Sequence, residues 1–234
     1  MAEASAWGKE AREAFASARE PARLAAAVVT FYRRLDEVLE ASVRAHAIHV
    51  ACTRGCSFCC HLRLEVQPHE AFALAAWLKR RFTPESLARV IARLRANAAK
   101  TRAMGREARK RTNLACALLA EDGTCSAYEA RPAQCRRYHS LDVESCKTFY
   151  ANPANEVLES PLHPAAAHNA AVIITHTQHA LRDAGLNSEN EDINFALLEA
   201  LENPKAWRRW RNGKAPFVEQ RIGTATASDG PRKT

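Results

Sequence analysis

The sequence predicts a mainly α-helical protein: an irregular helical domain built around a cysteine-rich metal core, with long loops and at most one short strand. Alanine is abundant and only 8 glycines occur, a composition that favours helices. Apolar residues recur at helical spacing over several long stretches. All 8 cysteines fall between residues 50 and 147, a region in which three chain reversals are expected.

Helical periodicity and start signals predict where the helices lie. Residues 5–20 and 22–50 should form two helices separated by Pro21, the second running directly into Cys52. Residues 62–66 alternate briefly and should form one short strand or an extended link. Further helices are expected to begin at Pro68, at Pro84 behind a Thr83 cap, at Pro164, and at a capping box formed by Ser188 and Glu191.

The chain divides into four parts, of which the first three should form one domain. Residues 1–50 are expected to supply helices that pack on the core, and residues 51–150 the cysteine-cluster metal-binding region. Residues 151–203 should add C-terminal helices of the same domain. Residues 204–234 are interpreted as a basic, aromatic tail that is partly disordered.

Length and charge limit the class of protein. A chain of 234 residues can bury a core of its own, and 47% hydrophobic residues argue against global disorder. The formal net charge of +8 permits a nucleic-acid, acidic-protein or membrane-surface partner without establishing one. We expect metal ions as partners, leave a protein or small-molecule substrate open, and do not expect nucleic acid.

The N-terminal segment predicts a cytoplasmic location. Residues 1–20 contain four glutamates and no apolar segment, so they are not a secretory signal peptide. No run of about 18 apolar residues occurs, so no membrane span is expected. In a reducing compartment, metal binding explains eight cysteines better than disulfides do.

The first cysteine group, Cys52-Thr-Arg-Gly-Cys56-Ser-Phe-Cys59-Cys60, places four thiols in nine residues. Thiolate is a soft ligand that selects zinc, copper(I) and iron–sulfur clusters. Cysteines this close in sequence can meet one metal at little cost in loop-closure entropy, and Gly55 lets the backbone turn. We therefore interpret this group as a metal site.

The second cysteine group is looser, and its wide spacings suit ligands gathered from loops and helix ends. A tight turn is expected at Asp122-Gly123. Cys116, taken alone, also fits the interpretation of a small buried apolar residue rather than a metal ligand. We expect all eight cysteines to bind zinc or an iron–sulfur cluster, in one site with spare cysteines or in two. The second group consists of Cys116, Cys125, Cys135 and Cys146.

Histidines near the cysteines are reserve ligands. His61 and His139 adjoin cysteines. His46 and His49 lie one turn apart at the end of a predicted helix, where we favour a capped or surface pair stabilised by the helix dipole over metal ligation. Arg136 is expected to neutralise thiolate charge or to pair with a nearby carboxylate.

Both cysteine groups resemble the YkgJ-type cysteine-cluster family, named for a CxxCxxCC signature and described as zinc- or iron-chelating. Cys125-Ser-Ala-Tyr-Glu-Ala-Arg-Pro-Ala-Gln-Cys135-Arg136 is similar to the second block of that family. Glu70 lies where the family often has an acidic residue that opens a helix. The resemblance covers about residues 50–147, although Cys52 and Cys56 are separated by three residues where the signature has two.

Two enzyme alternatives remain. Written as Cys-x3-Cys-x2-Cys, the first group also matches the cluster loop of radical S-adenosylmethionine enzymes, but those carry it after a strand, whereas the flanks here are predicted helical. The flagellin lysine N-methylases carry a similar cysteine cluster, so the resemblance also implies methyl transfer from S-adenosylmethionine. No methyltransferase-type glycine-rich loop is visible in the sequence. We assign no catalytic residue.

Two basic segments have competing interpretations. Residues 100–111 could grip phosphates, but we favour a solvated helix face. Residues 205–211 combine arginines with Trp207 and Trp210, which either contact a nucleic acid or membrane or attach the tail to the body. We favour attachment.

Overall fold

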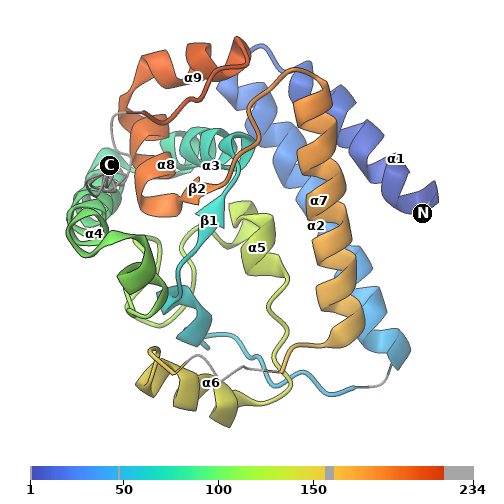
Figure 1. Ribbon diagram of the computed structural model, residues 1–234, viewed down its shortest axis with the longest axis vertical. Coiled ribbons are helices and arrows are strands. Elements are labelled where there is room, and N and C mark those ends of the chain that lie inside the picture. The colour runs from blue at the N-terminus through green and yellow to red at the C-terminus, as the bar shows by residue number, and fades with distance from the viewer. Residues whose placement is uncertain (1, 47, 156–160, 219–234) are drawn as a thin grey trace, which may run out of the picture.

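The computed structural model describes residues 2–46, 48–155 and 161–218 and confirms a mainly α-helical fold. Figure 1 shows the helices arranged around a central region that the cysteine-bearing segments cross. One group comprises α1 (Ala2–Ala11), its π-helical continuation η1 (Arg12–Ala16), α2 (Pro21–His46) and α7 (Pro164–Asp183). The other comprises α3 (Pro68–Arg81), α4 (Pro84–Lys110), α8 (Ile193–Glu202) and α9 (Pro204–Arg211). The groups meet where α2 packs on α3.

Local sequence signals account for most helix starts. α3, α4 and α7 begin at the predicted prolines, whose fixed φ suits the first helical turn. The hydroxyl of Thr83 accepts a hydrogen bond from the backbone N–H of Ser86 at 3.3 Å and so caps α4. The apolar stripe of α2 is buried at Leu24, Val28, Phe31, Leu35 and Leu39. Within the described residues, no helix has the length and apolar character needed to span a membrane.

The sequence analysis expected at most one short strand, within residues 62–66, and missed the second strand, β2. β1 (Glu65–Val66) pairs antiparallel with β2 (Glu191–Asp192), with Glu65 opposite Asp192. The predicted capping box at Ser188 is wrong, because Asp192 caps α8 by accepting a hydrogen bond from the N–H of Asn194 at 2.9 Å. Glu191 therefore belongs to the strand that precedes the helix.

The second helix is shorter than predicted. α2 ends at His46, and residues 48–52 have no helical structure. The backbone N–H of Ala51 donates to the carbonyl of Ser140 at 2.8 Å. This hydrogen bond holds the non-helical segment against Ser140, and the helix does not run directly into Cys52.

The tryptophans of α9 attach the C-terminal segment to the body. The ring of Phe72 on α3 lies 5.3 Å from Trp207, 5.4 Å from Trp210 and 5.4 Å from Phe217. The indole N–H of Trp210 donates to the carbonyl of Asn187 at 2.9 Å. The favoured interpretation of this pair is confirmed. The predicted disorder of the tail concerns residues 219–234, which lie outside the described residues.

A buried histidine sits where α2 meets α3. His69 is 1% exposed, and its Nε2 atom lies 3.1 Å from the hydroxyl oxygen of Tyr32. That hydroxyl donates its one hydrogen to Glu70 at 2.8 Å, so Nε2 of His69 must carry the proton and donate. Burial lowers the pKa of His69 to about 3, so the ring stays neutral in the folded protein.

We predict that His69 makes the protein less stable in weak acid. The unfolded chain binds a proton at this ring below pH 6.5, whereas the folded chain does not until about pH 3. As the pH decreases across this window, the free energy of unfolding therefore decreases by up to about 1.4 kcal/mol per pH unit from this group. Urea unfolding between pH 7 and 5 should show a shallower pH dependence in His69→Gln than in the wild type. Equal slopes would contradict the prediction.

Candidate metal centre

The first cysteine group forms two consecutive turns. In the first, the backbone N–H of Cys56 donates to the carbonyl of Thr53 at 3.0 Å. The second is a 3₁₀ turn, η2 (Phe58–His61), in which the N–H of Cys60 donates to the carbonyl of Ser57 at 2.9 Å. These two turns carry the closely spaced cysteines of the first group.

Backbone contacts join the first group to the second. The N–H of Cys116 donates to the carbonyl of Cys60 at 2.8 Å. The predicted turn at Asp122-Gly123 lies against the turn at Gly55: a Cβ atom on Gly123 would stand 2.5 Å from the carbonyl oxygen of Gly55. Gly123 also has a φ of +80°, which other residues rarely adopt. Only glycine at position 123 permits this close approach of the two loops.

A buried carboxylate fixes the segment that carries Cys135. This cysteine lies in the single turn α5 (Ala133–Arg136). The carboxylate of Glu70, 6% exposed, accepts hydrogen bonds from the N–H groups of Gln67 and Ala133, both at 2.8 Å. It thereby links the starts of α3 and α5.

Arg136 ties the same turn to α2. Its guanidinium pairs with Asp36 and donates to the carbonyl of Tyr32 at 3.2 Å and to that of Glu129 at 2.7 Å. The expected pairing of Arg136 with a carboxylate is confirmed. Because Arg136 is 2% exposed, the pairing also satisfies a charge that would be costly to bury alone.

Ser140 contacts both the first and the last of the eight cysteines. Its backbone N–H donates to Sγ of Cys52 at 3.2 Å, and its hydroxyl accepts from the thiol of Cys146 at 3.2 Å. Cys146 lies on the short helix α6 (Val143–Ala151). Burial raises the pKa of Cys52, and the neighbouring Cys56, Cys59 and Cys146 add to this effect.

The pKa shifts of the remaining thiols show which cysteines are neighbours. Burial raises the pKa of Cys135 well above its usual value, and Cys116, Cys125 and Cys59 raise it further. Burial likewise raises the pKa of Cys116 to about 11, with a contribution from Cys125. Neighbouring thiols disfavour ionisation because thiolates repel each other.

Cys59 and Cys60 interact directly although they are adjacent in sequence. A hydrogen bond between their side chains lowers the pKa of Cys59 to about 7 and raises that of Cys60. Cys116 and Cys135 also raise the pKa of Cys60. This pair therefore stands where the two cysteine groups meet.

All eight predicted cysteines thus gather in one region, and all are free thiols. Among the residues that the structure describes, no three cysteine, histidine, aspartate or glutamate side chains are arranged to hold one metal ion. The thiol set fits a soft metal by its chemistry. Ligation by the individual cysteines stays a prediction.

The reserve histidines take part in other contacts. Nδ1 of His61 lies 3.0 Å from the carbonyl oxygen of Ser57, and its ring packs on Tyr150 at 4.9 Å. Nδ1 of His46 lies 2.8 Å from a carbonyl oxygen of its own helix, in line with the favoured surface interpretation. His139 is half-buried, burial lowers its pKa, and its Nδ1 atom has no hydrogen-bond partner.

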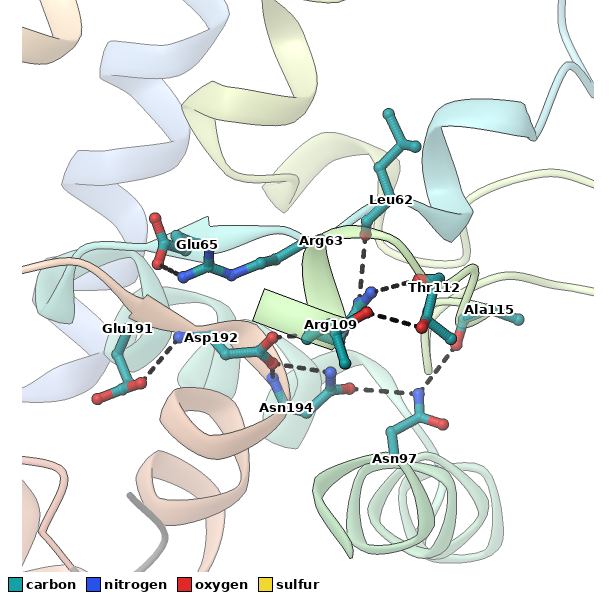
Figure 2. A network of polar contacts seen from close by, with 11 residues as sticks. Leu62, Arg63, Glu65, Asn97, Arg109, Thr112, Ala115, Glu191, Asp192 and Asn194 are labelled. Carbon is teal, nitrogen blue, oxygen red and sulfur yellow. Dashed lines mark hydrogen bonds and ion pairs between the residues drawn. The ribbon is translucent and has the colours of Figure 1, made fainter. Parts of the chain in front are cut away.

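A buried polar network holds the chain on either side of the cysteines, as Figure 2 shows. Arg109, near the end of α4, donates to the carbonyl of Thr112 at 2.9 Å and to that of Leu62 at 3.4 Å. Leu62 follows Cys60, and Thr112 precedes Cys116. One guanidinium therefore fastens both cysteine-bearing segments to α4.

Asp192 supplies the counter-charge for this arginine. Nε of Arg109 lies 3.6 Å from Oδ2 of Asp192, and both side chains are 2% exposed or less. Asp192 also accepts from the side-chain amide of Asn194 at 2.8 Å, and Asn97 in turn donates to Asn194 at 3.2 Å and to the carbonyl of Ala115 at 2.9 Å. The network extends from β2 across α8 to α4.

Sequence reasoning missed this network. Arg109 lies within residues 100–111, which we interpreted as a solvated helix face. Lys110 and Arg111 are exposed as expected, but Arg109 is buried. Nothing in the basic run distinguishes Arg109, because its partner Asp192 comes from a distant part of the chain.

We predict that Asp192→Asn destabilises the fold by about 3 kcal/mol, because it leaves Arg109 buried without a counter-charge. Glu202→Gln makes the same chemical change in an exposed ion pair with Arg95 and should cost less than about 1 kcal/mol. Denaturant unfolding of both variants measures the difference. Similar losses would show that the Arg109 pair has no special role.

Comparison with known proteins agrees with the cysteine arrangement. Residues 51–156 match the family model CxxCxxCC, described as "Putative zinc- or iron-chelating domain". No curated protein and no solved structure matched the chain. The matched residues contain all eight cysteines together with Glu70, Arg109 and Arg136. Residues 51–156 are therefore similar to a domain that is described as zinc- or iron-chelating.

Proposed function

We propose that the eight cysteines hold zinc or an iron–sulfur centre, and that metal binding through thiolates is the activity of this protein. The observation that carries the proposal is the gathering of eight free thiols from separate turns into one region. Metal identity is the finer part of the proposal, and the experiments below distinguish zinc from iron.

Charge supports the proposal. Burial raises the pKa values of Cys52, Cys116 and Cys135, and neighbouring thiols raise them further, because ionising several of them brings like charges together. Burial raises the pKa of Cys125 as well. Arg131 and Arg136 oppose this rise, but Asp36 already pairs with both arginines. A bound cation is the natural remaining counter-charge, because thiols bind metals in their deprotonated form.

The neighbour relations favour two sets of four thiols. Cys52 interacts with Cys56, Cys59 and Cys146, which makes one set. The other set comprises Cys60, Cys116, Cys125 and Cys135. Cys59 and Cys60 then belong to different sets, although their side chains are hydrogen-bonded. Cys59 also raises the pKa of Cys125 and Cys135, so it lies where the two sets meet. Four thiolates suit a closed structural zinc site or an iron–sulfur cluster.

Purification without oxygen, followed by metal analysis and visible spectroscopy, tests the metal itself. We expect bound zinc in a colourless protein, or iron with broad thiolate-to-iron absorption. Two zinc ions per chain would agree with two four-thiolate sets. Protein that contains neither metal when prepared this way, and does not take up either, would refute the proposed function.

Single substitutions test the division into two sets. Cys135→Ser and Cys146→Ser should each remove about half of the bound metal, since each belongs to one set only, and each should lower the melting temperature because metal binding contributes to folding. His176→Gln, a change on α7 away from the cysteines, is the control and should alter neither quantity. Loss of all metal from either cysteine variant would indicate a single centre.

The alternative function, methyl transfer from S-adenosylmethionine, stays a prediction of the sequence resemblance. The chelation proposal does not require turnover, and the same metal analysis applies to both functions.

A further inference from the structure

A pocket with a volume of about 340 Å³ lies beside the cysteine region. Leu62 and Gln134 line it, and they are close neighbours in sequence of Cys60 and Cys135 respectively. α7 forms the facing wall with Ile173 and Thr177. This volume is at the lower end of the range for small-molecule sites, so the pocket suits a metabolite-sized ligand rather than a macromolecule.

One wall of the pocket carries a buried carboxyl group that forms no ion pair within the described part of the chain. Glu70 lines the pocket, and its oxygens accept hydrogen bonds from Tyr32, Gln67 and Ala133. Burial raises the pKa of Glu70, while these hydrogen bonds and the charge of Arg136 oppose the rise. A cationic group on a ligand would stabilise the ionised form of this buried carboxyl group.

Another part of the lining is basic. Arg63 and Lys110 both line the pocket, and both lower the pKa of Glu107, so they share one electrostatic environment. Arg63 pairs with Glu65 through one terminal nitrogen, while its Nε atom is buried without a hydrogen-bond acceptor. Lys110 is half-exposed at the pocket and pairs with Glu107 at 2.8 Å. An incoming carboxylate would find charged donors here.

A buried hydroxyl in the lining of the pocket also has no hydrogen-bond partner. Thr177 is 2% exposed and lines the pocket, yet its Oγ1 atom makes no hydrogen bond. Leaving a buried hydroxyl unsatisfied costs free energy, so such a group at a pocket wall suits a polar ligand atom. Apolar side chains, Ile173 and Phe149 among them, complete the lining.

We propose that this pocket binds a small zwitterionic molecule of the amino-acid class. Its ammonium group is placed at Glu70, its carboxylate at Arg63 and Lys110, and a polar atom at Thr177. The formal charges of the lining residues Arg63, Lys110, Glu65 and Glu70 sum to zero, which matches a ligand that carries both charges. The proposal concerns a separate site from the thiols and does not depend on which metal they hold.

Calorimetric titration of the full-length protein, as purified with its metal, tests the ligand class. The probes are free L-amino acids and ω-amino acids of increasing chain length, with amine-only and carboxylate-only analogues of each. We expect at least one zwitterion to bind, and its single-charge analogues to bind at least about tenfold more weakly. Absence of binding by every zwitterion at millimolar concentration, or equal binding of a single-charge analogue, would overturn the proposal.

The Thr177→Val substitution tests whether the ligand binds in this pocket. Valine keeps the shape and removes only the unpartnered hydroxyl, so the melting temperature should not fall while the zwitterion binds about threefold to tenfold more weakly. Thr101→Val is the matched control, because Thr101 is also buried with an unpartnered hydroxyl but does not line the pocket. Equal effects of the two substitutions on binding would contradict the site.

The Lys110→Gln substitution tests where the carboxylate of the ligand binds. Because the Lys110 side chain is exposed, its replacement should not disturb folding. Binding of the zwitterion should weaken severalfold, whereas the amine-only analogue should be unaffected. Lys147→Gln is the control: Lys147 has the same exposure and the same kind of ion pair, with Glu144, but lies outside the pocket. If Lys110→Gln weakens binding no more than Lys147→Gln does, the assigned orientation is wrong.

Discussion

Buried charged side chains fasten the cysteine-bearing loops to the helices, and the arrangement of the thiols depends on them. Glu70 connects α3 to α5, Arg136 connects α5 to α2, and Arg109 connects α4 to the segments beside Cys60 and Cys116. These loops bury few large apolar side chains, so hydrophobic packing alone gives them little stabilisation. Charge-assisted hydrogen bonds hold them instead.

This arrangement divides the structure into parts stabilised by different forces. Helix packing around Phe31, Phe72 and Trp210 is apolar, whereas the loops depend on buried polar contacts. The thiols, at the centre of those loops, repel each other when ionised. A metal would therefore act on the part of the protein that has the least stabilisation of its own, which is why metal content and melting temperature should change together.

Sequence reasoning predicted the features that depend on neighbouring residues. The helix starts at Pro68, Pro84 and Pro164 follow from local proline and capping preferences. The membership of the cysteine region followed from spacing and family resemblance. The prediction of the α8 cap was wrong because Glu191 pairs with the distant strand β1, so the helix begins only at Ile193 and Asp192 caps it.

Features that depend on distant residues could not be predicted. The burial of Arg109 requires Asp192, and the pocket is lined from several helices and loops that sequence reasoning does not bring together. The contact between the two cysteine groups has the same origin, because the turn at Gly123 lies against the distant turn at Gly55. Pattern and spacing identify candidate ligands but not which of them face each other.

The contact between Gly55 and Gly123 sets the distance between the loops by backbone atoms alone. Side chains on the outer surface of the same loops, such as Thr53, Arg54 and Glu121, take no part in that spacing and are exposed. The surface around the thiols can therefore change its charge and shape freely while the inner geometry is preserved.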